Sequence, residues 1–579
     1  MKKSLEKSGQ KLAKRWSRFS RKASTEGKEH IKENLISRFS HVRRVRLLIL
    51  EWALLVAVIT FLAITQAFWY SESYATETFT NGGTYVEANL GKVNSLNPLF
   101  ATTSSEKTLA KLMFASITAP DYSGHTGLDL ADNVKAQDNS AKTWSIKLRD
   151  DLKWSDGYPI TNADVLYTIK VIQDPRVNTS YRKNLRNVRV TEEDGRLVFS
   201  LPSADANFPT KLEIPVLPEH ILKDVSTEQL LEHSFSTNPI TSGPFTYNAT
   251  QAVGSDGEKI VYLNPNKYYY NGTPMLDNFV VHAYLTTDDI IDAMKSGAAT
   301  ATAELSAADA AEVRSATVYE KQSALSSGVY AFINTDSPVL SKKNLRQAVR
   351  QGLNMAELRA PLGDAPALNY PFTSTQVNLA SFPPLPEHNA DAAKETIAAA
   401  GLTENDVITI ATVSAGFLPE LAENMANQLA ALGMRATTAV YEPNQDFMTN
   451  VIRTRAYDIL IYEIELGPDT DLYPYYHSSQ ASESGGLNLS NYRNKLADDM
   501  ILSARSTLNE TERNAKYQTF LKYWIDDVPA IGIYQVNMSY YFNRSVRTYS
   551  DDNRLTEPTD RFTDVYYWAA EKTKKNRTP

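Results

Sequence analysis

The distribution of hydrophobic and polar positions divides the chain into three parts. Residues 1–46 are polar and rich in Lys and Arg, and residues 47–69 form one nearly continuous apolar run. Beyond a short polar segment, strand-like and helix-like patterns alternate to the end of the chain without a repeat of fixed period. This alternation predicts a mixed α/β fold and argues against a solenoid or a propeller.

Local signals place individual elements in the third part. Apolar and polar side chains alternate over residues 144–148, which predicts a half-buried strand. Thr161 and Asp164 have the spacing of a capping box, so we expect a helix to begin there. Two long helical patterns follow later in the chain and predict helices at about 493–507 and 510–526.

The apolar run at residues 47–69 is long enough to cross a membrane, and it contains one charge, Glu51. Arginines at residues 43–46 stand just before it, so the positive-inside rule predicts a cytoplasmic N-terminus. The bulk would then be extracellular or periplasmic. The alternative is a cleaved signal peptide with Ser73–Ala75 as a rough cleavage site, but secretory signals usually have a much shorter basic region.

The net charge of −7 conceals an asymmetry between the tail and the rest of the chain. Residues 1–46 hold 15 Lys or Arg against four Glu, so everything after them is strongly acidic. A basic tail can bind lipid or nucleic acid, particularly with Trp16 and Phe19 among its charges. We favour a topology signal beside anionic lipid and expect no nucleic-acid partner.

Composition and motif spacing favour a binding protein over an enzyme. The chain has no cysteine, which excludes disulfides, thiolate metal sites and a lipid-modified cysteine anchor. Its eight histidines include no i, i+4 pair of the kind that binds zinc on a helix. The phosphate-loop pattern fails because Val86 stands where its first glycine should be. We therefore expect no catalytic residues, no metal and no cofactor.

A series of motifs runs in order through residues 82–548. It comprises Gly82–Tyr85, Leu96–Pro98, the segment 143–175 (TWSIKLRDDLKWSDGYPITNADVLYTIKVIQDP), Thr241–Phe245, Asn264–Asp277 and residues 330–349. These motifs resemble the extracellular solute-binding proteins of family 5, the peptide-binding and nickel-binding group that serves ABC transporters. The segment 143–175 is the most specific match.

The resemblance implies an α/β, two-lobed fold of the periplasmic-binding-protein type (class II, with an extra inserted subdomain), preceded by one transmembrane helix. The chain would cross between the lobes near residues 328 and 536. The expected parts are a basic cytoplasmic tail (1–46), a transmembrane anchor (47–69), a linker (70–81), a first lobe (82–119, 239–327 and 537–568) with an inserted subdomain (120–238), a second lobe (328–536) and a C-terminal tail (569–579).

The resemblance also implies a ligand held between the lobes, near the acidic loop that follows the strand at 457–462. In peptide-binding members an acid there faces the ammonium group of the ligand, but the corresponding position in this chain is Gly467, a departure from the family. The candidate residues are Glu465, Asp469 and Asp471 for the ammonium group, Tyr473 and Tyr475 as pocket walls, and Arg455 for a ligand carboxylate. The alternatives are a solvated acidic loop and tyrosines that belong to the core.

We therefore predict a membrane-anchored substrate-binding protein of an ABC importer. It would bind dipeptides or oligopeptides without a covalent step and deliver them to permease subunits. The same fold could instead hold an oligosaccharide or a chelated metal ion. Two other classes stay open, namely an anchored hydrolase that uses the acidic loop and an adhesion protein that has lost the ability to close.

Overall fold

The computed structural model describes residues 39–73, 75–363, 365–482, 485–551 and 554–576. Most of the basic tail, and with it most of the predicted topology signal, lies outside these ranges. The described chain forms two compact units: one joins the segment up to Thr78 with the segment from Lys572, and the other is Phe79–Glu571.

Helix α2 (Phe39–Ser73) contains the predicted anchor. Its segment Leu47–Gln66 has a mean hydropathy of 2.7, and none of it is buried within the protein. An apolar helix of this length can span a membrane, although a signal helix has the same properties. The segments expected to be a linker and a C-terminal tail contain regular structure, because β1 (Ala75–Thr80) pairs with β18 (Glu571–Asn576).

One ten-stranded sheet runs through Phe79–Glu571, in the order β15-β14-β16-β13-β17-β12-β2-β11-β10-β9. Its strands are β2 (Thr84–Leu90), β9 (Phe245–Val253), β10 (Glu258–Pro265), β11 (Asn278–Tyr284), β12 (Ala301–Thr302), β13 (Val318–Ile333), β14 (Val407–Val413), β15 (Arg435–Tyr441), β16 (Ile459–Glu465) and β17 (Ala530–Asn543). Smaller sheets pair β3 (Thr118–Pro120) with β4 (Thr126–Leu128) and order β5 (Ala131–Ala136), β6 (Thr143–Leu148), β8 (Arg196–Ser200) and β7 (Arg189–Glu193) as β5-β6-β8-β7.

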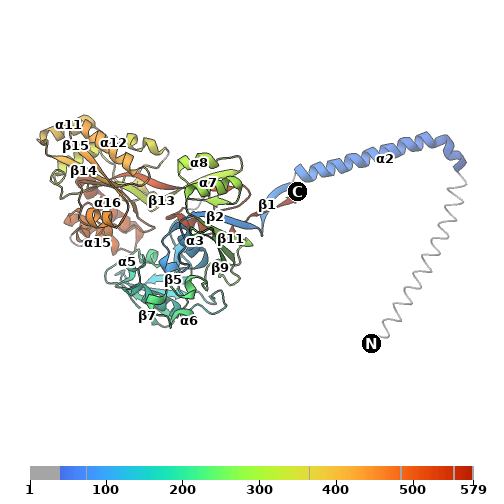
Figure 1. The fold of residues 1–579 in the computed structure, drawn as a ribbon, viewed down its shortest axis with the longest axis horizontal. Helices are drawn as coiled ribbons and strands as arrows, with labels where there is room; N and C mark the ends of the chain where they lie inside the picture. Colours follow the sequence, from blue (N-terminus) through green and yellow to red (C-terminus); the bar gives the residue numbers. More distant parts are fainter. Residues whose placement is uncertain (1–38, 74, 364, 483–484, 552–553, 577–579) are drawn as a thin grey trace. The chain divides into compact units, whose positions relative to one another are not determined.

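The helices of this body are interspersed with the strands along the chain. They are α3 (Ser104–Met113), α4 (Asn162–Gln173), α5 (Arg182–Leu185), α6 (Glu219–Leu222), α7 (Thr287–Ser296), α8 (Ala307–Val313), α9 (Lys343–Gly352), α10 (Met355–Arg359), α11 (Ala390–Ala399), α12 (Leu418–Ala431), α13 (Gln445–Phe447), α14 (Tyr473–Tyr476), α15 (Lys495–Arg505) and α16 (Glu510–Asp527). In Figure 1, α12 lies beside β14 and β15, α7 lies beside β2, and α8 lies beside α7.

Elements predicted from local signals are present. Strand β6 covers the alternating segment, and α4 begins directly after Thr161. The carboxylate of Asp164 accepts a hydrogen bond from the backbone N–H of Thr161 at 2.7 Å, as the capping-box spacing predicts. Helices α15 and α16 occupy the two long helical patterns.

Two long antiparallel strands, β13 and β17, lie at the centre of the sheet. Their register is interrupted between Ala324 and Gly328, where the strands bend away from regular pairing. A side chain at Gly328 would collide with Leu368, so glycine permits the close approach there. The crossings predicted near residues 328 and 536 fall at this interruption, and the lobe boundaries themselves stay a prediction.

Separate hydrophobic cores lie on the two sides of this interruption. The core of the second lobe contains buried residues such as Leu429 and Trp524. The core of the first lobe contains Tyr85 and continues through Trp144, so the inserted subdomain shares it. Each lobe is thus held together by its own buried apolar surface, which allows the two lobes to act as rigid halves.

Candidate ligand-binding site

The acidic loop lies between the end of β16 and the start of α14. At the end of β16 successive side chains point to opposite faces of the sheet, so Glu465 is exposed while Ile464 is buried. Asp471 is buried, and its carboxylate accepts a hydrogen bond from the backbone N–H of Tyr473 at 3.1 Å. The loop is therefore folded against the protein and is not a freely solvated segment.

Five charged side chains meet where the inserted subdomain contacts this loop, and we call them the interlobe ion cluster: Asp205, Lys211, Asp469, Asp471 and Arg505. The Lys211 ammonium lies 2.5 Å from Asp205, 3.3 Å from Asp469 and 3.4 Å from Asp471. The Arg505 Nε lies 2.9 Å from Asp471. None of the five side chains is more than 15% exposed, so water screens these charges weakly.

Further polar contacts join the same two segments. The backbone N–H of Ala206 donates to the carbonyl of Arg505 at 2.8 Å, and the Asn207 amide donates to the Thr470 hydroxyl at 3.2 Å. The Arg505 guanidinium also stacks over the Tyr473 ring at 4.5 Å. The contact between the lobes is therefore made by specific hydrogen bonds and ion pairs between named residues of both lobes.

Burial and charge act in opposite directions in this cluster. Burial raises the pKa of Asp469 to about 6, although attraction by Lys211 lowers it. For Lys211, burial alone would lower the pKa, but the three surrounding carboxylates outweigh it and hold the pKa well above its ordinary value. The lysine therefore stays charged at neutral pH.

The remaining predicted residues take different places. The Tyr475 hydroxyl donates to the Glu465 backbone carbonyl at 3.1 Å, and the Tyr473 hydroxyl bonds with Ser479 at 2.9 Å. Arg455 is buried with φ +54°, and its Nη2 donates to the carbonyls of Gly486 and Asn488 at 2.8 and 3.0 Å. Its guanidinium thus holds backbone of the second lobe in place.

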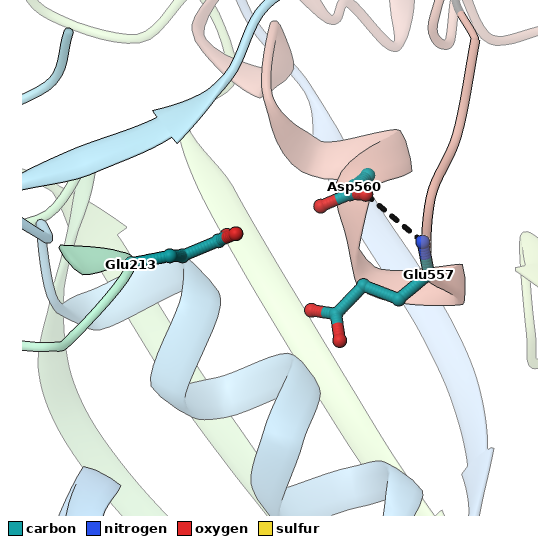
Figure 2. A group of neighbouring side chains, drawn as sticks. All are labelled: Glu213, Glu557 and Asp560. Carbon is teal, nitrogen blue, oxygen red and sulfur yellow. Dashed lines mark hydrogen bonds between the residues drawn. The ribbon is translucent and has the colours of Figure 1, made fainter. Parts of the chain in front are cut away.

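A second group of charges lies in the first lobe. Figure 2 shows Glu213 extended toward Glu557 and Asp560. Glu557 stands just before the 3₁₀ turn at Pro558–Phe562, and Asp560 lies within it. The Lys111 ammonium, from α3, lies 2.5 Å from Glu213 and 3.3 Å from Asp560. Burial raises the pKa of Glu213 to about 8; Lys111 opposes this shift, and repulsion by Asp560 and Glu557 adds to it.

The three carboxylates are close enough to ligate a metal ion, since one oxygen from each lies within 4.8 Å of the others. However, the Lys111 ammonium already contacts oxygens of two of them. The second Asp560 oxygen accepts hydrogen bonds from the backbone N–H groups of Thr556 and Glu557 at 2.9 and 3.0 Å. This arrangement suits a lysine and its counter-charges better than a divalent cation.

Negative charge from both lobes reaches the same region. Burial raises the pKa of Glu557, repulsion by Asp560 raises it further, and Glu465 of the second lobe adds a smaller repulsion. Among the described residues, Glu465 has no ion-pair partner. Lys111 already serves the acids of the first lobe, so Glu465 is the carboxylate here that is left to receive a positively charged group.

A separate surface groove of about 530 Å³ lies on α4, with Leu166, Ile169, Lys170 and Arg176 in its wall. None of its lining residues belongs to the acidic loop or to the two charge clusters.

Comparison with known proteins decides the family. Residues 127–484 match the sequence profile of the bacterial extracellular solute-binding proteins, family 5 (middle region). The chain belongs to this family. The oligopeptide-binding protein AppA of Bacillus subtilis is 24% identical over 499 residues, which cover 79% of this chain and 87% of that protein.

Solved structures agree with the predicted two-lobed fold. The structure of Bacillus subtilis AppA in complex with a nonapeptide matches this family 5 protein with a TM-score of 0.66 and 21% identity, over 85% of this chain and 99% of AppA. NikZ from Campylobacter jejuni in complex with Ni(L-His) matches with a TM-score of 0.67 and 20% identity, over 84% of this chain and 99% of NikZ. CtaP from Listeria monocytogenes matches with a TM-score of 0.72 and 22% identity, over 85% of this chain and 100% of CtaP.

Several charged residues of this family 5 protein were missed by the sequence reasoning. Lys211 and Asp205 stand in the inserted subdomain, and Arg505 ends α15, so each is far in sequence from the acidic loop. No periodicity or motif links them to Asp469. Only the excess of acids in the loop pointed to a need for cations.

Proposed function

We propose that this family 5 protein is the membrane-anchored substrate-binding subunit of an ABC importer and that it binds dipeptides or oligopeptides between its lobes. Helix α2 would hold the protein in the membrane with its body outside, where it would deliver peptides to permease subunits. The relative AppA, named an oligopeptide-binding protein and solved with a nonapeptide, supports this assignment. Capture requires only that the ligand favours the closed state.

The position of Glu465 carries the proposal. It is exposed at the end of β16, and its charge is felt by Glu557 of the first lobe. An ammonium group is the natural complement to Glu465, a carboxylate with no ion-pair partner among the described residues, and a peptide carries such a group at its N-terminus. We propose that Glu465 binds this group directly, and that Asp469 and Asp471, which pair with Lys211 and Arg505, add negative charge nearby.

The aromatic and basic candidates would act around this contact. Tyr473, whose ring contacts His477 and Arg505, and Tyr475, whose hydroxyl bonds with Glu465, would form walls for the peptide. Arg455 would act indirectly, because its guanidinium fixes the backbone of the second lobe at Asn488.

Calorimetric titration of the full chain in lipid nanodiscs with a diverse peptide library tests the assignment. For a peptide that binds, acetylation of its N-terminus and the substitution Glu465→Gln should each weaken binding about tenfold or more, and the two changes together should cost little more than either. Glu442→Gln, at an exposed position after β15, is the matched control and should bind normally.

Failure of every peptide in the library to bind would remove the peptide assignment. Mass spectrometry of molecules that co-purify with the chain would then identify the true ligand, including an oligosaccharide or a nickel chelate such as the one in the NikZ structure.

A further inference from the structure

The interlobe ion cluster contains three carboxylates and two cations, and these are distributed unevenly between the lobes. Asp205 and Lys211 both belong to the inserted subdomain and lie 2.5 Å apart. Asp471 and Arg505 both belong to the second lobe and lie 2.9 Å apart. Each of these two ion pairs can therefore persist when the lobes separate.

Asp469 is different from the other acids. Among the described residues, its carboxylate has one cation partner, Lys211, which lies in the opposite lobe at 3.3 Å. The Asn207 amide, also from the opposite lobe, donates to the same carboxylate at 3.4 Å. With the lobes together, Asp469 is 14% exposed and depends on these contacts across the junction.

We propose that Lys211 is an interlobe latch: its ammonium balances the buried charge of Asp469 only when the two lobes are together, and so favours the closed arrangement. Separation of the lobes leaves Asp469 to be hydrated by water. The latch does not depend on the chemistry of the ligand, so it goes beyond the proposed peptide-binding function.

The energetics follow from the cost of burying an unpaired charge. Without Lys211, the closed arrangement would bury Asp469 with no compensating cation, which is unfavourable by several kT or more. Asp205 would lose its lysine partner in both arrangements, so that loss does not bias the equilibrium, and in the open arrangement hydrated Asp469 does not need the lysine. Removal of the lysine should therefore shift the equilibrium toward the open arrangement.

Distance measurement between two spin labels tests the latch. The chain has no native cysteine, so the changes Lys170→Cys on α4 and Glu423→Cys on α12 give unique labelling sites, both exposed, one on each lobe. In the full chain in nanodiscs with no peptide added, Lys211→Met should raise the ratio of long to short interlobe distances about tenfold or more. Lys211→Arg, which keeps the charge, should restore the short distances.

Two further variants separate the latch from a general loss of structure. Lys147→Met removes a lysine that pairs with Asp132 and Asp150 within the first lobe at 3.9 and 3.6 Å, and should leave the distances unchanged. In an Asp469→Asn background, Lys211→Met should have a much smaller effect, because the charge that the lysine balances is gone.

An unchanged distance distribution in Lys211→Met would overturn the proposal. So would an equal shift with and without Asp469→Asn, because the lysine would then not act through that carboxylate. If the methionine variant does not fold, Lys211→Gln removes the same charge and retains a hydrogen-bonding side chain, and the same two outcomes apply.

Discussion

The ion pair between Glu87 and Arg561 offers a direct test of what holds the first lobe together. Arg561 Nη2 lies 2.7 Å from Glu87 Oε1, and the two side chains are 1% and 0% exposed. The Tyr540 hydroxyl donates to the other Glu87 oxygen at 2.6 Å. This network connects β2, near the start of the body, with the 3₁₀ turn at Pro558–Phe562, near its end.

The substitution Arg561→Met should destabilise the first lobe by about 3–5 kcal/mol, the usual cost of leaving one member of a buried pair without its partner. The retained Tyr540 hydrogen bond places the expected value toward the lower end. The thermal midpoint of the first lobe should then fall by roughly 6–15 °C, as measured by differential scanning calorimetry of the full chain in nanodiscs. Adding Glu87→Gln should recover part of this loss, because no uncompensated charge then remains buried.

A surface pair supplies the control for this experiment. Arg176 lies 2.6 Å from Asp174, but its side chain is 58% exposed, so Arg176→Met should leave the thermal midpoint nearly unchanged. The reasoning is refuted if Arg561→Met melts like the original protein. It is refuted as well if the double variant is less stable than Arg561→Met alone.

Three other measurements check separate parts of the structure. Because the pKa of Glu213 rises from 4.5 in the unfolded chain to about 8, its contribution to stability is complete below pH 4.5 and disappears as the pH rises to 8. Denaturant titrations should show a decline of up to about 1.4 kcal/mol per pH unit across that range, and Glu213→Gln should abolish this component. Gly243→Ala should lower the thermal midpoint, since a Cβ there would lie 2.6 Å from the backbone carbon of Met113; a midpoint equal to the original would contradict this packing. Alkaline carbonate extraction of cell membranes should leave the full chain in the pellet, whereas replacement of several leucines in Leu47–Gln66 by lysine should release it; release of the unaltered chain would argue against an anchor.

Local chemistry made much of the fold predictable. Thr161 and Asp164 predicted the start of α4 because the capping interaction involves residues three positions apart. The helical patterns before β17 were readable for the same reason, since burial on one face repeats every turn. The family resemblance supplied the arrangement of lobes that such short-range signals cannot give.

The partners of the acidic loop could not be predicted in this way. Lys211 and Asp469 are brought together by the approach of two lobes that fold around separate cores, so no local pattern relates them. The same holds for Lys111 and Glu557, which come from opposite ends of the first lobe's sequence. The close approach of Leu368 to Gly328, beside the register shift between β13 and β17, likewise has no local signal, because the two residues are far apart in the sequence.

The paired strands β13 and β17 form a narrow ribbon between the lobes. Such a ribbon resists stretching and shear within its own plane, because both would break its ladder of hydrogen bonds, but it bends readily out of that plane at an irregular point. Relative motion of the two lobes should therefore be a hinge motion in one principal direction. Ligands of different size would then be accommodated by stopping the hinge at different angles, while each lobe keeps its own internal structure.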